Sequence, residues 1–65
     1  MEDFAGAIDD YNKAIELNPN YAIAYANRGV IRGKLNNLEG ACRDWQKAVD
    51  LGFEKARDPV EKYCR

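Results

Sequence analysis

The sequence contains a stretch that recurs after 34 residues, and this internal repeat constrains the fold more than any other feature. In the first copy, apolar residues stand at offsets of 0, 3, 4, 7, 10 and 11: Phe4, Ala7, Ile8, Tyr11, Ala14 and Ile15. The second copy has the same offsets: Leu38, Ala41, Cys42, Trp45, Ala48 and Val49. This spacing is typical of one face of an amphipathic helix. The shift also superposes Gly6 on Gly40 and Asp10 on Asp44, which indicates two copies of one structural unit.

A further helix is expected between the two copies. Pro19, flanked by Asn18 and Asn20, predicts a helix end and a turn. Small and apolar residues then recur at helical spacing: Ala22, Tyr25, Ala26, Gly29, Val30 and Gly33. Asn36 and Asn37 predict the next turn. We therefore expect three consecutive helices with short connections.

The end of the chain allows two interpretations. Asp58 could be the N-cap of a short final helix, with Pro59 at its first position and Glu61 three residues after the cap. Alternatively, a helix begins near Glu54 and has Pro59 in an early turn.

Composition excludes several classes of function. Hydrophobic residues make up 46% and charged residues 32% of the 65, a balance typical of a folded domain. The ten basic and eleven acidic residues are interspersed, so the chain has no basic face for nucleic acid or a membrane surface. No apolar stretch is long enough for a signal-peptide core or a spanning helix, and we expect a cytoplasmic location.

The residue types needed for catalysis are not grouped in this sequence. Histidine is absent, which removes the commonest general base and metal ligand. The adjacent acids Asp9 and Asp10 diverge on a helix and do not form a catalytic pair. We therefore expect no enzyme, no metal site and no cofactor.

The unit from residue 20 to residue 52 resembles the tetratricopeptide repeat (TPR) on five positions: Tyr25, Gly29, Ala41, Trp45 and Ala48. Small residues there let two helices approach closely, and the aromatic residues fill the space beside them. Residues 2–18 resemble the second helix of a preceding repeat, with matching residues at Ala7, Tyr11 and Ala14 and the usual terminal proline at Pro19.

This resemblance implies a single all-α domain over residues 1–65, a right-handed α-solenoid of antiparallel helix-turn-helix repeats. Residues 53–65 would form the capping helix. The sequence departs from the family pattern at Arg28, Arg32 and Phe53. For Arg28 we expect an ion pair with Asp10 or Asp44 and a guanidinium stacked on Tyr11 or Trp45.

The resemblance also places the two cysteines. In this register Cys42 faces the following helix and Cys64 lies on it. A bridge between them would attach the cap to the repeat and add roughly 3 kcal/mol of stability. Two free buried thiols are the alternative, because disulfides are rare in reducing compartments.

TPR arrays typically bind an extended peptide or a partner helix on a concave face lined by the first helix of each unit. The corresponding positions are Ile23, Asn27, Val30 and Lys34, with Arg57 in the cap. The function implied is a non-catalytic scaffold module for a protein or peptide partner. The alternative is self-assembly into a homodimer, because the stripe on the first predicted helix lacks its usual covering helix.

Overall fold

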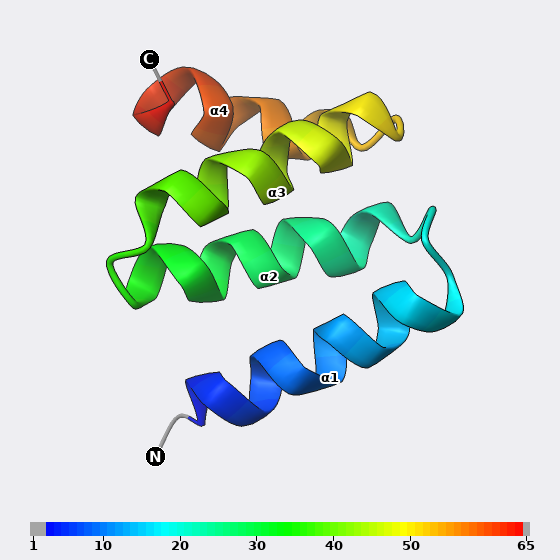
Figure 1. Ribbon diagram of the computed structural model, residues 1–65. Helices are drawn as coiled ribbons and strands as arrows, with labels where there is room; N and C mark the ends of the chain where they lie inside the picture. Colours follow the sequence, from blue (N-terminus) through cyan, green and yellow to red (C-terminus); the bar gives the residue numbers. More distant parts are fainter. Residues whose placement is uncertain (1–2, 65) are drawn as a thin grey trace.

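The computed structural model describes residues 3–64 and confirms the predicted all-α fold (Figure 1). Three consecutive helices run antiparallel: α1 (Phe4–Leu17), α2 (Ala22–Lys34) and α3 (Leu38–Asp50). A short 3₁₀ turn, η1 (Glu54–Ala56), leads directly into α4 (Arg57–Tyr63), which packs on α3. The predicted domain limits at residues 1, 2 and 65 lie outside the described residues.

The 34-residue sequence repeat also includes the residues that cap the N-termini of α1 and α3. Asp3 caps α1 by accepting a hydrogen bond of 2.9 Å from the Gly6 amide. Thirty-four residues later, Asn37 caps α3 and accepts one of 3.1 Å from Gly40. A Cβ on Gly40 would lie 2.6 Å from the Asn37 side chain. The repeated glycines therefore leave room for the capping side chains.

Residues with positive φ stand in the turns that follow α2 and α3. Asn36, with φ of 64°, separates α2 from α3. Gly52, with φ of 100°, follows α3. The Phe53 amide donates a hydrogen bond of 2.9 Å to the Ala48 carbonyl across the turn. This is the geometry of a glycine-terminated helix, and it leaves Phe53 packed against the core.

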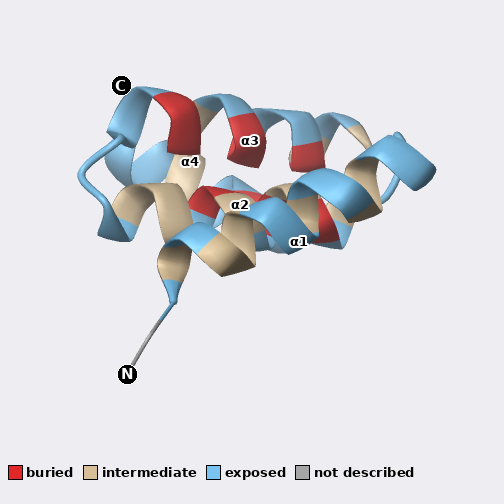
Figure 2. Ribbon diagram, turned by 60° about the horizontal axis from the view of Figure 1, so that its bottom comes forward, coloured by how far each residue is buried: buried red, intermediate tan, exposed pale blue. Residues whose placement is uncertain are grey.

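The core lies between α2 and α3 and beneath η1 (Figure 2). Its buried members are small residues around one large ring: Ala26, Ala41, Trp45, Ala48 and Ala56. By contrast, α1 has no buried residue. The buried core therefore belongs to the residue 20–52 unit and the cap, and α1 packs at its edge.

The bounds of η1 and α4 show which of the two interpretations of the chain end is correct. Helical structure begins at Glu54, and Pro59 is the third residue of α4, where its missing N–H costs no intrahelical bond. Asp58 lies inside α4, whose N-cap is Ala56, so the interpretation of Asp58 as an N-cap is wrong.

Candidate functional site

One stripe of α2 faces away from the core. The predicted partner-binding residues Ile23, Asn27, Val30 and Lys34 all lie on it and are exposed. Ile23 and Val30 are 48% and 44% exposed, which is high for β-branched apolar side chains. The stripe therefore presents apolar surface to solvent.

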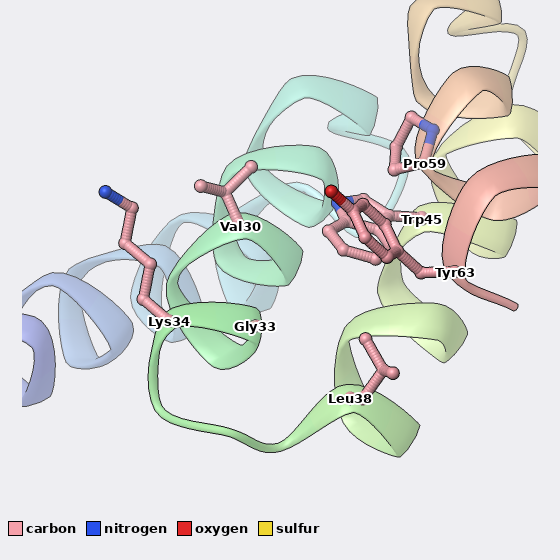
Figure 3. A pocket seen from close by; sticks show the side chains of 7 residues that line it. All are labelled: Val30, Gly33, Lys34, Leu38, Trp45, Pro59 and Tyr63. Carbon is pink, nitrogen blue, oxygen red and sulfur yellow. The ribbon is translucent and has the colours of Figure 1, made fainter.

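Beside this stripe, a hollow of about 440 Å³ lies between α2, the first half of α3 and α4 (Figure 3). Its lining is mainly apolar: Val30, Gly33, Lys34, Leu38, Trp45, Pro59 and Tyr63. We call this hollow the α2–α4 groove. Its residues come from three helices, so the groove depends on how α4 is docked.

Trp45 lies at the bottom of the α2–α4 groove and is 6% exposed. The Tyr63 ring lies next to it, with ring centroids 6.0 Å apart. On the other side, Gly29 approaches so closely that a Cβ there would lie 2.7 Å from Trp45 Nε1. The groove is thus shallow and aromatic at its base, a surface suited to an apolar side chain.

Of the five predicted partner-binding residues, the groove brings together Val30 and Lys34. The Lys34 side chain extends toward α1, with Nζ 5.9 Å from the centroid of the Phe4 ring. Ile23 and Asn27 continue the α2 stripe outside the groove. Arg57 forms an ion pair with Glu54, three residues earlier, with Nε 2.9 Å from Oε2. The Arg57 hydrogen bond lowers the pKa of the Glu54 carboxyl.

The sequence analysis does not assign five of the groove residues to partner binding: Gly33, Leu38, Trp45, Pro59 and Tyr63. It assigns Trp45 to repeat packing. Pro59 and Tyr63 reach the groove because η1 turns α4 back over α3. Only the apolar character of Pro59, Val60 and Tyr63 at helical spacing could have indicated this from the sequence.

Behind the groove, Asp44 is 3% exposed and accepts hydrogen bonds from two arginines of α2. Arg28 holds both carboxylate oxygens, at 2.9 and 2.8 Å, and Arg32 approaches to 3.1 Å. The hydrogen bond to Asp44 raises the pKa of Arg28, against the opposing effect of burial. This cluster satisfies a buried charge and holds α2 on α3.

Arg28 also links α2 to α1. Its Nη1 donates a hydrogen bond of 2.7 Å to the side-chain oxygen of Asn12, and its guanidinium lies 5.5 Å from the centre of the Tyr25 ring. The ion pair predicted for Arg28 is therefore formed with Asp44, one of the two candidates. The predicted stacking on Tyr11 or Trp45 is wrong, because Tyr25, one turn earlier on the same helix, supplies the ring.

A disulfide joins Cys42 of α3 to Cys64 directly after α4, with Cα atoms 5.7 Å apart. Val60 packs beside it, against the same core. The bond lies at the far end of α4 from η1, so α4 is attached to α3 at both ends.

Residues 3–64 contain no cluster of three or more potential metal ligands. None of the helices in this part of the chain is both long and apolar enough to cross a lipid bilayer.

Helical repeat proteins consist of stacked pairs of antiparallel helices, and the first helix of each pair lines a common binding surface. The fold described above places this chain in that class. The profile of the TPR repeat matches residues 1–36, and the chain belongs to the TPR family. RNA polymerase II-associated protein 3 of Xenopus laevis is 49% identical over 51 residues, covering 78% of this chain and 8% of the relative.

Two further relatives carry the repeat in their names. Small glutamine-rich tetratricopeptide repeat-containing protein beta of Homo sapiens is 44% identical over 43 residues, 66% of this chain and 14% of the relative. Tetratricopeptide repeat protein 36 homolog of Drosophila melanogaster is 42% identical over 59 residues, 83% of this chain and 32% of the relative. The chain thus spans at most about a third of these relatives. No solved structure matches the chain.

Proposed function

We propose that the chain is a non-catalytic interaction module whose α2–α4 groove binds a polypeptide segment through one inserted apolar side chain. The observation that carries this proposal is an apolar hollow over a buried tryptophan, open to solvent and lined from three helices. Membership of the TPR family supports it, because such repeats generally mediate protein–protein interaction.

Exposed apolar residues at the groove supply the driving force. Val30 of α2 and Leu38 of α3 both line the groove and are each 44% exposed, so a bound side chain would remove apolar surface of both from water. A bound segment that runs along α2 would then reach Asn27 and Ile23, which supports keeping these residues in the proposed binding surface. Arg57, already paired with Glu54, is the weakest member of the predicted set.

The test is selection of a displayed random-peptide library on the immobilised chain, followed by affinity measurements with the enriched peptides. Val30→Glu places a charge in the groove and should weaken binding about tenfold or more. Leu17→Glu is the matched control, since Leu17 is 75% exposed at the end of α1, outside the groove. Equal effects of the two variants, or no enriched peptide, would contradict the proposal.

Self-assembly into a homodimer is the second candidate, and the absence of any buried residue on α1 favours it. Covering α1 with another copy would add the burial that a small domain lacks. Asp10 opposes a direct pairing of two α1 helices, because it stands on the same helix face as Ala7, Tyr11 and Ala14 and like charges of both copies would come close together. We therefore rank self-assembly below partner binding.

The proposed cytoplasmic location and the Cys42–Cys64 disulfide favour different compartments, because reducing compartments keep most thiols reduced. Thiol labelling of the protein extracted from its cells under acidic quenching would decide between them. Labelled thiols support the cytoplasmic proposal, and protected thiols favour an oxidising compartment.

A further inference from the structure

The Cys42–Cys64 disulfide joins α3 to α4 beside the groove residues of both helices. On α3, Cys42 stands four residues after Leu38 and three before Trp45, and both of these line the α2–α4 groove. Residues at such spacings stand on the same side of a helix. At the other end of the bond, Cys64 directly follows Tyr63, the groove residue whose ring centroid lies 6.0 Å from that of Trp45. The bond therefore attaches the α4 wall of the groove to its α3 base.

A second hollow, of about 370 Å³, lies directly beside the groove and touches the disulfide. It is lined by Leu38, Glu39, Cys42, Tyr63 and Cys64. Leu38 and Tyr63 thus line both hollows. The two cysteines are only partly buried, so a small dithiol in solution can reach the bond. A change at the disulfide would act on residues that form the groove.

The α4 wall has few other attachments. The helix supplies Pro59 and Tyr63 to the groove, yet it has seven residues and none of them is buried. A helix of that length does not persist without tertiary packing. Ala56 and Val60 pack on the core near the start of α4, whereas Tyr63, at its end, is 53% exposed. Breaking the disulfide would therefore loosen the wall first at Tyr63.

We infer that, on the basis of the proposed function, the disulfide regulates the α2–α4 groove: the oxidised chain binds a polypeptide segment there and the reduced chain does not. The switching reaction is thiol–disulfide exchange with a dithiol. One thiolate of the dithiol attacks a protein sulfur and forms a mixed disulfide, and the second displaces that sulfur. The dithiol is oxidised to a disulfide, and the protein gains two electrons and two protons as two thiols. Groove binding would then follow the thiol–disulfide balance of the compartment.

The probe is a cysteine-free peptide enriched from the displayed library on the oxidised chain. Its affinity is measured for the oxidised chain and for the chain reduced with dithiothreitol. Reduction should weaken binding about tenfold or more, while the NMR amide shifts of the buried residues Ala26 and Ala48 remain those of the folded chain.

Equal or tighter binding by the reduced chain would overturn the regulation and leave the proposed function standing. Absence of any enriched peptide would contradict both. Collapse of the Ala26 and Ala48 shifts on reduction would overturn the regulation as well, because the whole unit would then unfold and not the groove wall alone.

Variants separate the bond from the wall. The Cys42→Ala, Cys64→Ala double variant should bind as weakly as the reduced chain and should not respond to dithiothreitol. Tyr63→Ala keeps the disulfide but removes the wall, so it should weaken binding by the oxidised chain. Asp58→Ala is the matched control, since Asp58 is an exposed residue of α4 outside the groove. A double variant that binds as tightly as the oxidised chain would contradict the regulation.

Thermodynamic linkage supplies a second readout. If reduction weakens peptide binding, bound peptide must oppose reduction by the same factor. In mixtures of reduced and oxidised dithiothreitol, saturating peptide should raise the ratio of reduced to oxidised reagent at half-reduction about tenfold or more. Thiol alkylation followed by mass spectrometry measures the reduced fraction. An unchanged ratio would show that the groove and the disulfide are independent.

Discussion

Gly29 and Gly33 of α2 both face Trp45, but at different distances. We therefore expect an added methyl group to have opposite effects on stability at the two positions. At Gly29 a Cβ would lie 2.7 Å from Trp45 Nε1 and 3.2 Å from the Ala41 carbonyl oxygen. At Gly33 the nearest atom would be 3.6 Å away, an ordinary contact. A single residue position thus decides whether the gain in helix propensity or the steric clash dominates.

We expect Gly29→Ala to lower the free energy of unfolding by about 1–2 kcal/mol, because overpacking exceeds the helix propensity of alanine. Gly33→Ala should raise it by up to about 1 kcal/mol. Urea denaturation followed by circular dichroism measures both. A stabilising Gly29→Ala would show that α2 and α3 are less tightly packed than the structure has them.

The repeated carboxylates provide a second comparison at the residue scale. Asp44→Asn should cost about 3 kcal/mol, because two arginines of α2 lose a buried charged partner. Asp10→Asn, at the equivalent exposed position, should change stability by less than about 0.5 kcal/mol. If Asp44→Asn does not fold, Arg32→Gln supplies a smaller, measurable loss of about 1 kcal/mol. Equal losses at Asp44 and Asp10 would contradict the cluster's role.

At the scale of elements, α4 is the one most dependent on its attachments. It has seven residues and no buried side chain of its own, and a helix of that length does not persist alone. It is attached by Ala56 of η1, which is 3% exposed, and by the disulfide of Cys64 to Cys42. Breaking the disulfide leaves η1 and the contacts of Val60 and Tyr63 to hold α4 in place.

Reduction should therefore unfold α4 while α2 and α3 remain helical. Hydrogen exchange by NMR should show loss of protection at Val60 to Cys64, with protection retained at Ala41 to Ala48. Global stability should fall by about 3 kcal/mol for a loop of this size. The Cys42→Ala, Cys64→Ala double variant is the control and should not respond to reductant. Unchanged α4 protection after reduction would show that η1 and the packing of Val60 and Tyr63 hold the helix without the disulfide.

The sequence predicted the helices that follow from local chemistry. The 34-residue repeat and the asparagine turns indicated α1, α2 and α3. The start of α4 was left open because Asp58-Pro59 also fits a helix start, and only the burial of Ala56 under α3 selects the earlier one. The groove was predicted only in part. Its aromatic base and its α4 wall depend on the return of the chain after Gly52, which no local pattern specifies.

At the scale of the whole molecule, the helices lie side by side in chain order, with α1 at one end of the row and α4 at the other (Figure 1). The α2–α4 groove is lined by residues of α2, α3 and α4. The groove and α1 meet at Lys34, whose Nζ lies 5.9 Å from the centroid of the Phe4 ring.

We expect the isolated chain to be a monomer at micromolar concentration, because pairing two α1 helices would place their carboxylates together. Multi-angle light scattering over a hundredfold range of concentration measures this, with and without reductant. A mass of twice 7.4 kDa that persists on dilution would favour the self-assembly function instead, and Asp10→Lys would then be expected to change the dimer's affinity.

The single tryptophan of the chain has a use beyond packing. Trp45 lies under the groove, beside Tyr63 of α4. Its fluorescence is therefore an intrinsic signal that requires no label. Release of α4 would expose the indole and move its emission to longer wavelength, and a ligand in the groove would shield it further. One optical measurement therefore distinguishes release of α4 from binding in the groove.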